Sequence, residues 1–151
     1  MTNIASLADL GHWLGKEFPP SPWVTVTQGE VQKFAEATGD HQWIHLDEER
    51  AARESPFGGT IAHGFLTLSL LSALMQQMIA IGGVKMGVNY GLNRVRFMSP
   101  VRAGCAVRAR FTLVEMTEVP GGRQLIWNSV IEQQGESKPC CVAEWVVRRF
   151  D

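Results

Sequence analysis

The amino-acid sequence predicts an α+β fold in which an antiparallel sheet packs against one central apolar helix. Helical patterns fill the first half of the chain, a long apolar segment begins at Gly64, and strand-like alternation follows over residues 84–150. A chain of 151 residues can bury a substantial core, and we expect a single domain over residues 1–151. The content of 45% hydrophobic and 19% charged residues is typical of a globular protein.

The elements of the first half are predicted from prolines, from helix-capping residues and from acidic residues at the start of a helix. Residues 1–22 carry three prolines close together and predict an extended arm. Thr27 and Glu30 have the spacing of a capping box, and Gly39 is suited to end the helix that they begin. We interpret residues 40–46 as a loop.

A second, short helix is predicted from the acidic start at Asp47 to about Arg53, followed by a turn over residues 55–59. Residues 64–81 are apolar on all sides rather than along one stripe, which predicts a buried helix. Hydroxyl and amide side chains interrupt this segment and two glycines follow it, so we do not expect it to span a membrane.

The second half changes to the period of two residues that is typical of half-buried strands. Residues 84–98 predict a first long strand, and the alternation of apolar and basic side chains over 105–113 predicts a second. A Pro-Gly-Gly turn at 120–122 separates the second strand from a third over 123–134, and residues 140–150 close the chain as a fourth.

Charge and cysteine content exclude several classes of protein. Fourteen Lys and Arg residues oppose fifteen Asp and Glu, a net charge of −1 that does not favour a nucleic-acid or anionic-membrane partner. The cysteines Cys105, Cys140 and Cys141 are odd in number and lack CxxC spacing, which favours reduced thiols in a cytoplasmic protein. Phosphate-binding loops, dinucleotide fingerprints and GxSxG motifs are absent from the sequence, so no cofactor is predicted.

Asp40 and His45 are the first candidates for chemistry. If the loop after Gly39 curls back, the carboxylate and the imidazole can converge on one water molecule and share general acid and base catalysis. The alternative is that Asp40 caps the loop and His45 only packs. His41 and His45 are four residues apart, but a segment that starts with glycine is not expected to be helical, and no metal site is predicted.

The His63-Gly64 pair stands at the start of the predicted buried helix. The backbone amides that open a helix are unpaired and favour negative charge, and glycine lets a carbonyl group approach them. The alternative for Gly64 is tight packing, and we expect His63 to be structural rather than catalytic. Ser72, two turns farther on, either bonds a carbonyl of the preceding turn or orients Asp40.

The stretch FAEATGDHQWIHLDEERA, followed by PFGGTIAHGFLTLSLL, resembles the signature of MaoC-like (R)-specific enoyl-CoA hydratases, within which it is most similar to the nodulation protein N-like branch. The resemblance covers about residues 24–150. It implies a hot-dog fold, a sheet wrapped around a long helix, and a homodimer formed through the sheets. It also implies that Asp40 and His45 are a catalytic dyad, that the Gly64 amide polarises a thioester carbonyl, and that Ser72 supports the dyad.

The implied reaction is reversible addition of water to a trans-2-enoyl-CoA, giving the (R)-3-hydroxyacyl form. We place four residues among the candidates for substrate binding: Gln42, His63, Ser72 and Arg94. Gln42 and Trp43 stand where the family commonly has Asn and Pro, so packing has to supply the rigidity of this loop. Arg94 is a candidate for contact with coenzyme A phosphates, the alternative being a solvated charge.

Two other functions are compatible with these residues. One is thioester hydrolysis on the same fold, in which a carboxylate activates water against the carbonyl carbon. The other is a module that binds acyl thioesters without turning them over, although such a module needs neither a dyad nor an oxyanion-stabilising amide. Acyl chain length is not predicted from the sequence.

Overall fold

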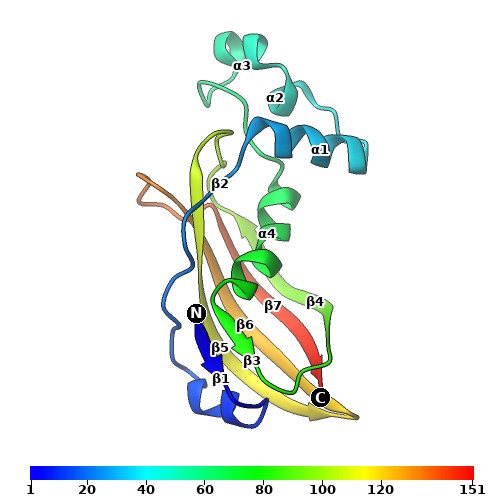
Figure 1. Ribbon diagram of the computed structural model, residues 1–151. Helices are drawn as coiled ribbons and strands as arrows, with labels where there is room; N and C mark the ends of the chain where they lie inside the picture. The colour runs from blue at the N-terminus through cyan, green and yellow to red at the C-terminus, as the bar shows by residue number, and fades with distance from the viewer.

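A five-stranded antiparallel sheet curves around one helix, α4 (Gly64–Gln76), in the computed structural model, which describes residues 1–151 (Figure 1). The strands lie in the order β2-β5-β6-β7-β4. Their bounds are Val24–Thr25 for β2, Met86–Phe97 for β4, Ala106–Val119 for β5, Gly122–Gln133 for β6 and Cys141–Phe150 for β7. The four long strands predicted from the alternating pattern are thus confirmed, and the arrangement is the hot-dog fold.

The core lies between α4 and the concave face of the sheet. On β5 from Val107 to Leu113, every second side chain is fully buried, while the arginines between them point to the convex face and bond carboxylates. Trp127 on β6 is 1% exposed and packs against Phe18 and Phe111, with ring centroids 5.8 and 6.3 Å away. The two-residue period therefore sorts apolar side chains to the helix-facing side.

Three short helices lie together beyond the N-terminal end of α4: α1 (Gln28–Thr38), α2 (Trp43–Leu46) and α3 (Glu48–Glu54) (Figure 1). We call residues 27–63, which contain them, the overhang. The predicted capping box is confirmed, because Glu30 N–H donates to the Thr27 hydroxyl while Thr27 N–H donates to the Glu30 carboxylate. Gly39 ends α1 with φ of +82°, as predicted.

Two predictions of local structure are wrong. The segment 40–46 is not entirely loop, because residues 43–46 form α2, a single turn too short to leave a periodic pattern. The predicted helix over 64–81 ends at Gln76, and Ile79–Ile81 form the strand β3. A short apolar run fits either a buried helix or a strand, and pairing with a distant segment decides between them.

That distant segment belongs to the region predicted as an extended arm. Thr2–Ile4 form β1, which pairs in parallel with β3, and Asp9–Trp13 form the 3₁₀ helix η1. The arm is therefore partly regular, and its buried side chains Leu7 and Leu10 close one end of the core.

The prediction that α4 is buried on all sides also needs correction. Leu71, Leu74 and Met75 are buried against the sheet, but Phe65 at the start of the helix is 70% exposed. Neither α4 nor any other helix combines the length and hydropathy that a bilayer-crossing segment requires.

Candidate active site

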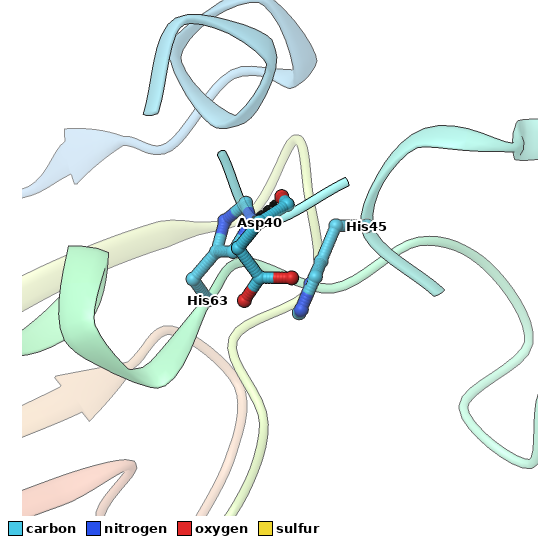
Figure 2. Close-up of side chains that lie close together, drawn as sticks. All are labelled: Asp40, His45 and His63. Carbon is cyan, nitrogen blue, oxygen red and sulfur yellow. Dashed lines mark hydrogen bonds between the residues drawn. The ribbon is translucent and has the colours of Figure 1, made fainter. Parts of the chain in front are cut away.

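Asp40, His45 and His63 meet where the overhang joins the N-terminal end of α4 (Figure 2). One ligand atom from each side chain lies within 4.8 Å of the other two. Asp40 is exposed, whereas His45 and His63 are 5% and 2% exposed. A charged group open to solvent is thus placed against two buried imidazoles.

His45 is held in one tautomer by the backbone. Its Nδ1 lies 2.7 Å from the carbonyl oxygen of Ile61, and because a carbonyl oxygen only accepts, Nδ1 carries the proton. The other ring nitrogen, Nε2, is left with a free lone pair. Burial lowers the pKa of His45, opposed by the bond to Ile61 and by the charge of Asp40, while the charge of His63 lowers it further. The imidazole is therefore suited to act as a neutral base.

Asp40 follows the left-handed Gly39 and is fixed by its own turn. The backbone N–H of Gln42 donates to the Asp40 carboxylate at 3.3 Å, and the Asp40 carbonyl oxygen lies 3.0 Å from Nε2 of His63. Gln42 thus contacts the site through its backbone N–H, and its side chain is exposed. Gln42, a candidate for substrate binding, is therefore joined to Asp40 by its main chain.

Gly64 opens α4, so its N–H has no partner within the helix. It lines a pocket of about 350 Å³ together with His45, Phe97 and Cys140. A Cβ atom on residue 64 would lie 3.2 Å from the Phe97 ring. The site therefore combines an unpaired amide with close access that only glycine gives without displacing a neighbour.

Two predicted site residues, Ser72 and Arg94, lie apart from Asp40 and His45 in the structure. Ser72 lines a separate pocket of about 310 Å³ between α4 and β4, eight residues beyond Gly64, and does not reach Asp40. Arg94 lies opposite Glu144 in the β4–β7 register, in a hollow that Asn128 also lines. Asn128 and Glu144 alternate with buried concave-face residues, which places Arg94 on the convex face, away from the dyad.

Sequence reasoning missed Gln28, which ties three segments of the overhang together. Its side-chain amide donates to the His45 carbonyl at 2.7 Å and accepts from the Thr60 hydroxyl at 2.5 Å. A glutamine that follows a helix cap carries no distinguishing pattern, so only the tertiary structure identifies it. Cys140 was also missed as a pocket residue, although burial raises the pKa of its thiol and makes it a poor nucleophile.

The side chains of Asp40, His45 and His63 also lie close enough to one another to be considered as ligands of a metal ion. One nitrogen of each histidine is already within hydrogen-bond distance of a backbone carbonyl, and the other nitrogen of His63 is buried. A cation would thus find His45 Nε2 and the Asp40 carboxylate, fewer than the three protein ligands of a catalytic zinc site. The arrangement suits proton transfer better than metal binding.

A family profile described as a MaoC-like domain matches residues 9–133. The chain is 52% identical over 149 residues to 3-hydroxyacyl-thioester dehydratase Z of Mycobacterium tuberculosis, covering 98% of each chain. It is 51% identical to nodulation protein N of Rhizobium leguminosarum bv. viciae, covering 97% of this chain and 92% of that one.

Among solved structures, the (R)-hydratase from A. caviae involved in PHA biosynthesis superimposes with a TM-score of 0.69 at 28% identity. That match covers 89% of this chain and 94% of the other. The family profile, the close relatives and the shared fold agree with one another. The chain belongs to the MaoC-like family of hydratases and dehydratases.

Proposed function

We propose that this protein catalyses the reversible hydration of trans-2-enoyl-CoA to (R)-3-hydroxyacyl-CoA. The observation that carries the proposal is the free Nε2 of His45: the His45 side chain lies beside the Asp40 carboxylate and lines a pocket together with Gly64, whose N–H opens α4. A base, a second water-binding group and an anion-stabilising N–H are what addition of water to a conjugated thioester requires. The names of the 52%-identical dehydratase and of the (R)-hydratase structure support the same chemistry and stereochemistry.

The proposed reaction begins with water bound between Asp40 and His45. Nε2 of neutral His45 takes a proton as the water oxygen attacks C3, while the Asp40 carboxylate accepts a hydrogen bond from the remaining hydrogen. The electron pair of the double bond moves to the thioester oxygen, which the Gly64 N–H stabilises. The imidazolium then returns its proton to C2, so that one water molecule is added and the free enzyme is restored.

A homodimer is the form in which we expect the enzyme to act. The strand β4 lies at the edge of the sheet, and its large apolar side chains are exposed in the single chain, among them Val88, Tyr90 and Leu92. An exposed apolar edge strand is a surface for pairing with another strand. The cytoplasmic location remains a prediction, in keeping with three free cysteines.

Asp40→Asn tests the proposal. We expect the wild type to remove the conjugated enoyl absorbance of crotonyl-CoA without release of free thiol, and the variant to lose roughly 10³-fold or more of kcat because the amide cannot serve as a charged acceptor. Asp47→Asn is the matched control, since asparagine caps a helix as well as the aspartate that caps α3.

Turnover by Asp40→Asn at the rate of the wild type would contradict the assignment. Release of free thiol would indicate thioester hydrolysis instead. Saturable binding of crotonyl-CoA without consumption, repeated with a longer enoyl chain, would indicate a binding module.

A further inference from the structure

His63 has an environment that a purely structural residue would not need. It is 2% exposed, and its Nδ1 is buried without a hydrogen-bond partner. An unpaired buried polar atom costs about 1–3 kcal/mol, which a phenylalanine or leucine at the same place would avoid. The presence of an imidazole therefore indicates that its remaining nitrogen or its ring is used.

The nitrogen of His63 that forms a hydrogen bond is Nε2. It lies 3.0 Å from the carbonyl oxygen of Asp40, and because that oxygen only accepts, Nε2 carries the proton and donates (Figure 2). The bond joins the start of α4 to a residue 23 positions earlier in the chain. It holds the exposed Asp40 turn, whose other contacts, to Thr38 and Gln42, lie within two residues of it.

The ring of His63 is used as well. It stacks on His45 with centroids 3.8 Å apart and planes 24° apart, and Phe34 contacts it at a centroid distance of 4.8 Å. The bond to Ile61 restrains one nitrogen of His45, and the stack restrains the plane of the ring. Together they direct the free Nε2 of His45 at the Asp40 carboxylate.

From these contacts we infer that His63 is a positioning residue of the dyad: its Nε2–H fixes the backbone of Asp40 and its ring fixes the plane of His45. This positioning role replaces the role in substrate binding that the sequence suggested for His63. The inference rests on the proposed function for its kinetic consequences. The statement that His63 holds the Asp40 backbone and the His45 ring depends on the contacts alone.

The two contacts can be separated by substitution. His63→Gln keeps an N–H donor near the place of Nε2 and loses the ring, whereas His63→Phe keeps a ring for stacking and loses the donor. We expect kcat to fall roughly 10–100-fold in His63→Phe with KM changed by less than about threefold, since small displacements of a catalytic group cost up to about 10²-fold. His63→Gln should retain more activity than His63→Phe.

The pH dependence supplies a readout that loss of packing alone would not produce. Asp40 and His63 are the ionisable side chains whose charges act on His45, in addition to burial and the Ile61 bond. Removing the imidazole at 63 removes an influence that lowers the pKa of His45, so the acid limb of kcat/KM should move to higher pH in both variants. His41→Gln, an exposed histidine beside Asp40, is the control and should leave the profile unchanged.

An NMR titration of His45 tests the inference without turnover. We expect the His45 pKa to rise in His63→Gln and His63→Phe relative to the wild type and to His41→Gln. If a folded His63→Gln protein titrates at His45 as the wild type does, the inference is overturned, as it is if a folded His63→Phe protein keeps the wild-type kcat. If the wild type itself does not hydrate crotonyl-CoA while the titration shifts as expected, the proposed function fails and the positioning role stands.

Discussion

The overhang and the sheet are held together by different forces. The sheet and α4 bury apolar side chains such as Phe111 and Trp127, a contribution that is spread over many contacts and needs no single partner. The overhang depends on a few directed hydrogen bonds, of which the most informative are those of Gln28 and of the two buried histidines. The difference teaches that stability and the proposed catalysis should be separable in this chain, because the proposed catalytic side chains Asp40 and His45 lie in the overhang, where fewer apolar side chains are buried.

Trp127→Ala should give the largest effect and should act on the sheet. Deleting a buried aromatic side chain costs about 3–5 kcal/mol, through lost burial and the cavity that remains. Chemical denaturation should show this loss in the free energy of unfolding. At a temperature where the variant is folded, its kcat per folded molecule should stay within about threefold of the wild type. A large loss of kcat with unchanged stability would contradict the view that the sheet supplies stability and the overhang carries the site.

Gln28→Ala should act on the overhang. The substitution removes the bonds to the His45 carbonyl and to Thr60, so α2 can shift relative to Ile61, and kcat should fall about tenfold. The loss of stability should be only about 1–2 kcal/mol, because two partly buried hydrogen bonds are lost. Gln32→Ala on the same helix is the matched control, since that side chain is exposed and bonds only Glu36. Equal kinetic effects of the two substitutions would argue against the role of Gln28.

The smallest effect is expected from pH. The pKa of His45 is lowered mainly by burial, so its neutral form persists below its ordinary titration range, and kcat/KM should fall only as the pH drops through that lowered pKa. The folded state disfavours the protonated imidazole, so this group costs stability under acidic conditions, while above its ordinary pKa both states are neutral and it contributes nothing. A profile of kcat/KM in parallel with denaturation at several pH values checks both. An acid limb above the ordinary value for histidine would contradict the assignment.

Local signals in the sequence predicted local structure well. The capping box at Thr27, the left-handed Gly39 and the alternation of β5 depend on residues close in the chain, and all three are confirmed. The end of α4 could not be predicted in the same way, because β3 exists through its pairing with β1 about 77 positions earlier. Apolar composition alone does not contain that information.

The candidate site was predictable in its residue types but not in its geometry. The spacing of Asp40 and His45 suggested a convergence that the fold provides. The tautomer of His45 depends on a carbonyl 16 residues away, and the bond of His63 to Asp40 spans 23 residues. Ser72 and Arg94 lie on the elements predicted for them, but Ser72 lines a separate pocket farther along α4 and the strand register places Arg94 on the convex face.

The parallel pair of β1 and β3 has a consequence for the synthesis of the chain. Thr2–Ile4 leave the ribosome before Ile79–Ile81 and have no strand partner until those residues have also emerged, after the whole overhang and α4. The β1–β3 pair can therefore form only after the overhang and α4 have been made. A tag fused at Met1, which is 76% exposed, would be attached to a segment whose strand partner is made about 77 positions later.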